Sequence, residues 1–96
     1  MVEYKTGYFA ESLCGHDKGC LYMIVDTDGD KVGLCDGVRR SGSNPKYKKK
    51  KHIQMIRSDD TAAEYKKQAG QTDRDRWIRE KIREFGNFSG YPGIRE

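Results

Sequence analysis

The most apolar segment of this chain, Leu21 to Val25, is only five residues long, and this limits what the chain can fold into. A membrane-spanning helix needs about 20 predominantly apolar residues. Hydrophobic residues make up 34% of the 96 residues and charged residues make up 35%. The N-terminal residues 1–5 lack the basic start and apolar stretch of a signal peptide. We therefore expect one small, core-poor, cytoplasmic domain without a membrane segment.

Turn residues divide the first part of the chain into short segments that are rich in β-formers. These segments are 4–13, 21–25, 31–36 and 52–56. Asp28-Gly29 predicts a type I′ hairpin, because glycine tolerates positive φ, and Asp36-Gly37 predicts a second turn. We expect five short strands between residues 4 and 57, as in a small antiparallel barrel or sandwich.

The composition after Arg57 is typical of helices. Ser58-Asp59-Asp60 precedes a run of helix formers over 61–69, which Gly70 ends or weakens. Thr72 is the expected N-cap of a second helix that ends at Gly86-Asn87. The sequence therefore predicts a small barrel or sandwich at 1–57, a helical extension at 58–86 and a flexible tail at 87–96.

The second predicted helix carries an apolar stripe beside an arginine-rich face. Its arginines are Arg76, Arg79 and Arg83. Its apolar residues are Trp77, Ile78, Ile82 and Phe85. A chain with so few apolar residues is expected to bury its tryptophan. We therefore expect the stripe to pack across the barrel.

The net charge of +4 conceals an uneven distribution along the chain. Residues 1–38 hold three Lys and seven acidic residues, and 58–96 hold eight of each sign. Residues 39–57 hold eight Lys or Arg and no acid. Such a block suits a polyanion, because every phosphate that it neutralises releases condensed counterions. A solvated loop that aids solubility is the alternative.

Metal sites are disfavoured by the spacing of the candidate ligands. Cys14, Cys20, Cys35 and His16 could be assembled into a zinc site, but structural zinc sites use a tighter Cys-x2–4-Cys spacing. We expect the three cysteines to be reduced, small hydrophobic residues, since their number is odd. The segment 26–30 lacks the glycine and glutamate positions of a calcium loop. No cofactor is expected.

Catalytic patterns are equally poor. His16 and His52 are the two histidines, and neither belongs to a recognisable nucleophile–base pair. The segment 15–19, Gly-His-Asp-Lys-Gly, lacks the Walker pattern and is interpreted as a tight turn. We therefore expect a protein that is not an enzyme.

The turn and its flanking segments resemble the KOW domain, which consists of a strand, a glycine-bearing loop and a second strand. Gly7, the segment 15–19 and Ile24-Val25 match its spacing. The further order of 34–37, Arg39-Arg40 and 44–54 is similar to that of the short bacterial KOW-domain RNA-binding proteins. Those proteins are themselves similar to a group of large-subunit ribosomal proteins of archaea and eukaryotes. The resemblance covers about residues 4–57, and it implies an SH3-like barrel that binds RNA. Together with the helical pattern after Arg57, the expected fold is mainly β, a small five-stranded SH3-like barrel followed by one or two C-terminal helices.

The resemblance and the charge block together give an RNA-binding hypothesis. Arginines suit bidentate phosphate contacts, lysines add point charges, and Tyr47 could stack on an unpaired base. The candidate RNA-binding residues are Lys18, Arg39, Arg40, Lys46, Tyr47, Lys48, Lys49, Lys50, Lys51 and His52. The expected partner is ribosomal RNA, together with neighbouring ribosomal proteins, and the chain is expected to be a monomer.

This chain also departs from the KOW pattern. Cys14 and Cys20 flank the loop where the family has a small and a basic residue, and Asp26, Asp28 and Asp30 make the next hairpin acidic. Both departures move the expected RNA contact toward Lys18 and 39–52. The competing hypothesis is a protein–protein adaptor of the transcription or translation machinery, with the acidic N-terminal half and the apolar stripe as its contact surfaces.

Overall fold

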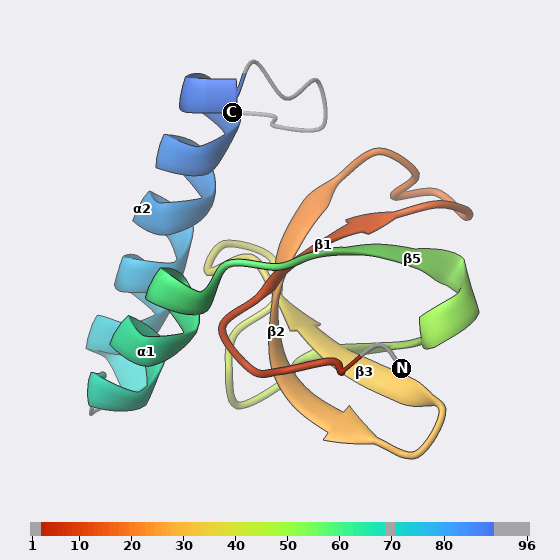
Figure 1. Cartoon of the computed structure of the whole chain (residues 1–96), viewed down its shortest axis with the longest axis horizontal. Helices are drawn as coiled ribbons and strands as arrows, with labels where there is room; N and C mark the ends of the chain where they lie inside the picture. The colour runs from red at the N-terminus through yellow and green to blue at the C-terminus, as the bar shows by residue number, and fades with distance from the viewer. Residues whose placement is uncertain (1–2, 69–70, 90–96) are drawn as a thin grey trace.

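Five antiparallel strands form one sheet in the order β4-β3-β2-β1-β5, and two helices lie on one side of it (Figure 1). The computed structural model describes residues 3–68 and 71–89. The elements are β1 (Phe9–Ser12), β2 (Leu21–Asp28), β3 (Lys31–Cys35), β4 (Lys46–Lys49), the 3-10 helix η1 (Lys50–His52), β5 (Ile53–Ile56), α1 (Asp59–Lys67) and α2 (Gln71–Ser89). The five strands and the two C-terminal helices are therefore confirmed. The mainly-β class is not, because the two helices are long enough to hold as much of the chain as the strands do.

The sheet has two edges in the part of the chain that the structure describes. β5 returns to pair with β1, from Phe9 opposite Ile56 to Ser12 opposite Ile53. β4 pairs with β3, and no ladder joins it to β5. The sheet is thus a five-stranded antiparallel sheet whose edge strands are linked by η1 and not by a closing ladder.

The strand boundaries differ from the expected ones where turns and charge intervene. The expected strand at 4–13 is limited to β1, since residues 6–7 form a turn. β4 lies in the lysine-rich segment, where β-propensity places no strand; pairing with β3 overrides that propensity. At the β2–β3 hairpin Gly29 has a φ of +61°, whereas Asp30 does not have positive φ. The predicted type I′ turn is therefore wrong, because that turn needs positive φ at both central residues.

Alternation along the strands divides the buried side chains between two faces of the sheet. The inner face carries Tyr8, Ala10, Tyr22, Ile24, Val32, Leu34 and Ile53. The helices add only Ala62 to this cluster, so the sheet must curl over its own inner face to bury it. The outer face carries Phe9, Leu21, Met23 and Cys35, which pack against the helices.

The apolar stripe of α2 packs on this outer face, as expected. Ile78 and Ile82 are 0% and 7% exposed, and the ring of Phe85 stacks on Phe9 with centroids 4.6 Å apart. On the flank of α2 that faces α1, Trp77 lies 6.2 Å from Tyr65 between centroids. Ile78 and Ile82 therefore belong to the core of this domain, whereas Phe85 and Trp77, which was expected to be buried, are only partly buried. No described helix combines the length and the apolar character that crossing a membrane requires.

Two glycines let the backbone approach the helices closely. A Cβ at Gly7 would lie 2.5 Å from Ala62 Cα on α1. A Cβ at Gly37 would collide with the Asp75 carbonyl and lie 3.0 Å from Arg79 Cβ on α2. Both glycines have positive φ, so a side chain is excluded there by sterics and by backbone conformation.

The helix ends also differ from the expected ones. α1 begins at Asp59 and ends at Lys67, close to prediction. α2 begins at Gln71, so Thr72 is not its N-cap, and it continues through Gly86-Asn87 to Ser89. One glycine within a helix costs only about 1 kcal/mol, and the packing of the apolar stripe outweighs it. The rest of the predicted tail, 90–96, lies outside the described residues, as does the predicted stop at Gly70.

Replacing Gly7 by alanine tests the close approach of α1. Gly7 and Gly19 have φ values of +95° and +89°, but nothing lies within 4 Å of a Cβ at Gly19. Gly19→Ala should therefore cost only the backbone strain of about 1–2 kcal/mol. Gly7→Ala should cost about 1–3 kcal/mol more, because α1 must move. Urea unfolding measures both, and equal losses would contradict this packing.

Candidate nucleic-acid interface

The loop between β1 and β2 holds a carboxylate inside the domain. Gly15 and Gly19 have positive φ, and the loop is closed by the bond from the Gly19 N–H to the Ser12 carbonyl at 2.8 Å. This tight turn brings Asp17 back toward the inner face, where the residue is 9% exposed. Lys18, the next residue, is exposed. The loop thus directs its acid inward and its base outward.

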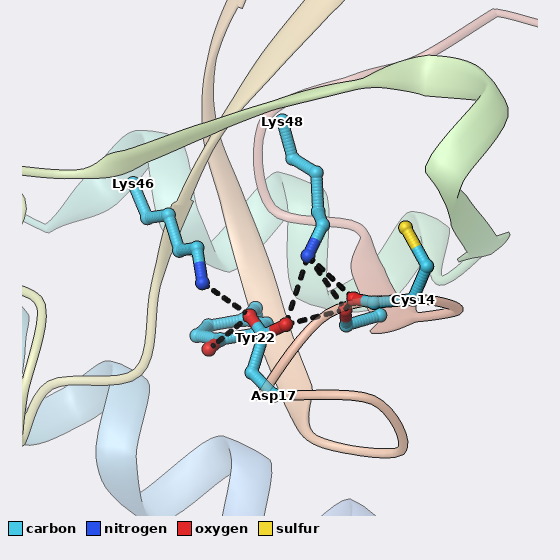
Figure 2. A network of polar contacts seen from close by, with 6 residues as sticks. Cys14, Asp17, Tyr22, Lys46 and Lys48 are labelled. Atoms are coloured by element: carbon cyan, nitrogen blue, oxygen red, sulfur yellow. Dashed lines mark hydrogen bonds and ion pairs between the residues drawn. The ribbon is translucent and has the colours of Figure 1, made fainter.

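Four side chains donate hydrogen bonds to the Asp17 carboxylate, each at 2.8 Å (Figure 2). The Ser12 hydroxyl and Lys48 Nζ reach Oδ1. The Tyr22 hydroxyl and Lys46 Nζ reach Oδ2. The carboxylate therefore links β1, β2 and β4 at one point.

Lys48 is the most enclosed member of this network. Its Nζ also donates to Ser12 Oγ at 2.9 Å and to the Cys14 carbonyl at 2.8 Å, so all three of its protons have acceptors. The Lys48 side chain is 11% exposed, against 31% for Lys46. A largely enclosed ammonium with three acceptors, one of them a carboxylate oxygen, forms a structural ion pair.

The network sets the ionisation of its members. Burial by itself raises the pKa of Asp17, but the hydrogen bonds from Lys46, Lys48, Tyr22 and Ser12 outweigh burial and hold that pKa well below its ordinary value. Burial and the bond to Asp17 raise the pKa of Tyr22 above its ordinary value. Asp17 is therefore an anion throughout the physiological range, and Tyr22 is neutral.

Alternation along β4 separates the predicted RNA-binding residues into two sets. Lys46 and Lys48 lie opposite Leu34 and Val32 and turn to the inner face. Tyr47 and Lys49 turn to the outer face and are exposed. Two residues of the candidate site are thereby committed to an internal carboxylate.

Tyr47 is held in place on the outer face beside β2 and β3. Its hydroxyl donates to Asp26 Oδ2 at 2.6 Å, and this bond raises the pKa of Tyr47. A Cβ at Gly33 would lie 3.2 Å from Tyr47 Cε1, so the glycine leaves room for the ring. The side chain is oriented by these contacts and stays 46% exposed.

The following residues continue the basic segment into η1. Lys49 and Lys51 are exposed, and His52 is half-buried. Lys50 is half-buried, with Nζ 4.9 Å from the centroid of the Tyr4 ring. Neither Lys49 nor Lys51 has a carboxylate partner among the residues that the structure describes.

Arg39 and Arg40 lie in the β3–β4 loop (residues 36–45), which its own carboxylate organises. Asp36 Oδ1 accepts the N–H groups of Val38, Arg39 and Arg40 at 2.9, 2.8 and 3.0 Å. The Arg39 side chain is exposed and that of Arg40 is half-buried. The loop therefore turns its acid toward backbone donors and leaves its arginines without a carboxylate partner among the described residues.

The structure divides the basic segment in space. The β1–β2 loop with Lys18 and the β3–β4 loop with Arg39 leave the same end of the sheet, because β1 and β3 end there. Lys49 lies at the other end of β4 and pairs with Lys31 beside the acidic hairpin. Arg39 and Lys49 thus lie toward opposite ends of β4, while η1 leads back to the start of the β1–β2 loop, where the Leu13 N–H donates to the His52 carbonyl at 2.9 Å.

The cysteines do not form a metal site in the described part of the chain, where no group of three or more His, Cys, Asp and Glu side chains is arranged to hold an ion. Cys14 and Cys20 are half-buried thiols. Cys35 is buried, and its Sγ donates to the Arg40 carbonyl at 3.0 Å. Burial raises the pKa of the Cys35 thiol to about 12.

Comparison with known proteins adds no family assignment: no protein-family model and no curated protein matches this chain.

Removing the Asp17 charge tests the network. Asp17→Asn should lower the free energy of unfolding at pH 7 by about 3 kcal/mol, because two inward lysines lose their anion. The matched control is Asp28→Asn, an exposed β2 carboxylate without an ion-pair partner in the described residues, and it should change little.

The same variant gives a pH dependence. Because the folded pKa of Asp17 is depressed, its stabilisation is complete above the unfolded pKa of about 3.9 and is lost as pH falls toward the folded value. The difference in stability between wild type and Asp17→Asn should therefore shrink from pH 7 to pH 3 in urea titrations. A difference that stays constant over this range would show that the charge of Asp17 is not what stabilises the fold.

Proposed function

We propose that this protein is a non-enzymatic RNA-binding module of the KOW type, associated with ribosomal RNA. Its five antiparallel strands, with η1 between β4 and β5, are compatible with the SH3-like barrel that the sequence resemblance implies. The proposed contact is electrostatic docking of the exposed basic groups on RNA phosphates. Such contacts position a protein on RNA and do not read its sequence.

One observation carries the proposal: most of the basic segment stays unneutralised after folding. Residues 39–57 contain eight Lys or Arg and no acid. The ion pairs found in the described residues use three of the eight, namely Lys46, Lys48 and Arg57. The remaining five are Arg39, Arg40, Lys49, Lys50 and Lys51. A small domain that keeps so many cations without carboxylate partners is suited to a polyanionic ligand.

The candidate residues have different roles in this proposal. Arg39 and Arg40 can each engage a phosphate through two parallel hydrogen bonds. Lys49, Lys51 and Lys18 supply point charges. Tyr47 offers an exposed, oriented ring on which an unpaired base can stack. Lys46 and Lys48 serve the fold and are no longer proposed as RNA contacts.

A protein–protein adaptor is the weaker proposal. The apolar stripe that favoured it packs against the sheet, with Ile78 and Ile82 buried and Trp77 and Phe85 partly buried, so little of it is left for a partner. The acidic hairpin of Asp26, Asp28 and Asp30 is the surface that such a partner would have to use, and Asp26 is already bonded to Tyr47.

Substitutions at neighbouring lysines distinguish effects on RNA binding from effects on protein stability. Lys49→Gln/Lys51→Gln should weaken binding to labelled fragments of large-subunit ribosomal RNA severalfold, with an unchanged free energy of unfolding. For wild type, log K should fall with log salt at a slope of about −3 to −5, and the double variant should lose about 1.5 of that slope. Fluorescence anisotropy at several salt concentrations measures both quantities.

The matched control is Lys48→Gln. It should lower the free energy of unfolding by about 3 kcal/mol, because Asp17 loses a buried partner, and it should leave the salt slope unchanged while the protein is folded. Wild-type binding that hardly depends on salt would contradict the proposal. An equal loss of slope in Lys48→Gln would show that the inward lysine also contacts RNA.

A further inference from the structure

Helix α2 gathers three of its arginines in one sector, although its acids and bases nearly balance. Arg76, Arg79 and Arg83, here called the arginine face, fall within a sector of about 60° of the helical wheel. Asp73, Glu80 and Glu84 fall within the neighbouring sector of about 40°, and Asp75 borders the arginines on the other side. A helix of this kind presents a cationic side that its net charge conceals.

The contacts of α2 show which neighbour each side faces. On one flank Lys81 Nζ lies 3.3 Å from Glu64 Oε1 of α1, and Trp77 packs near Tyr65. On the other flank lies the β3–β4 loop, whose Gly42 N–H donates to Asp75 Oδ1 at 2.9 Å. α2 therefore lies between α1 and the β3–β4 loop.

The arginine face lies on the flank of the β3–β4 loop. Gly37 packs against the backbone and Cβ of Arg79, and Gly42 is bonded to Asp75. These two anchor points bracket Arg39 and Arg40 in the sequence. The loop segment that carries Arg39 and Arg40 is thereby held against α2 at Asp75 and Arg79, although almost forty residues separate loop and helix along the chain.

The acids nearest to this junction are turned toward backbone donors. Asp36 Oδ1 accepts three N–H groups of the loop. Asp75 Oδ1 accepts the Gly42 N–H and lies 3.9 Å from Cys35 Sγ. Arg76 and Arg79 form no ion pair or hydrogen bond with another described residue. Their guanidinium groups stay available for a ligand.

From this arrangement we infer that the arginine face of α2 and the β3–β4 loop form one continuous phosphate-binding surface, and that RNA bound by the loop also lies against α2. The inference rests on the proposed RNA binding and extends it to a helix outside the region that resembles the KOW domain. Guanidinium groups suit it, because each can engage a phosphate bidentately and none can lose its charge.

The test is Arg76→Gln/Arg79→Gln, with Lys66→Gln/Lys67→Gln on α1 as the matched control. Both lysines are exposed, and both double variants remove two positive charges. With labelled large-subunit ribosomal RNA fragments, the arginine variant should bind about tenfold more weakly and lose about 1.4–1.8 of the salt slope. The lysine variant should change affinity by less than about twofold.

Unfolding midpoints in urea show whether either double variant is destabilised. Both variants should have the same midpoint as wild type. Equal losses of affinity in the two double variants would overturn the inference, since they would report only net charge. Unchanged affinity in Arg76→Gln/Arg79→Gln, with Lys49→Gln/Lys51→Gln still weakened, would overturn it as well and leave the proposed function standing. Wild-type protein that binds no RNA would overturn both.

Discussion

The Asp17 carboxylate is the interaction on which the rest of the structure depends. It gathers donors from β1, β2 and β4 at a point where a domain with few apolar residues has little else to bury. An unpaired carboxylate or ammonium there would be costly, so the anion and its two lysines need one another. The orientation of β4 follows, and with it the exposure of Tyr47 and Lys49.

Elements that depend on local composition and periodicity could be predicted from the sequence, whereas an element that depends on strand pairing could not. The apolar run of β2, the turns at Gly29 and Gly37 and the burial of Ile78 and Ile82 follow from composition and periodicity. β4 could not be placed, because its sequence of Lys and Tyr has no apolar alternation. The inward orientation of Lys46 and Lys48 is explained only by the Asp17 carboxylate, which lies some thirty residues earlier in the chain. The one sequence signal that could have found them is the period-2 spacing of Lys46 and Lys48.

The basic segment illustrates the same limit for function. Its charge density pointed to a polyanion, but linear density does not show which cations are consumed by folding. Two lysines neutralise Asp17, and Arg39 and Lys49 lie toward opposite ends of β4. The β3–β4 loop that carries Arg39 packs against α2 at Asp75 and Arg79, through Gly37 and Gly42, and the sequence count does not show this contact. The proposed RNA-binding surface therefore depends on how the chain packs and not on the linear density of charge.

The central claim is that Lys48 stabilises the fold while its neighbours Lys49 and Lys51 bind RNA. The chemical reactivity of these lysines tests this claim most directly. The protein would be acetylated briefly at neutral pH, with and without large-subunit ribosomal RNA fragments, and the modified lysines quantified by mass spectrometry. In free protein, Lys48 should react far more slowly than Lys49 and Lys51, and RNA should protect Lys49 and Lys51 while leaving Lys48 unchanged. Equal reactivity of Lys48 and Lys49 in free protein, or RNA protection confined to Lys48, would contradict this account.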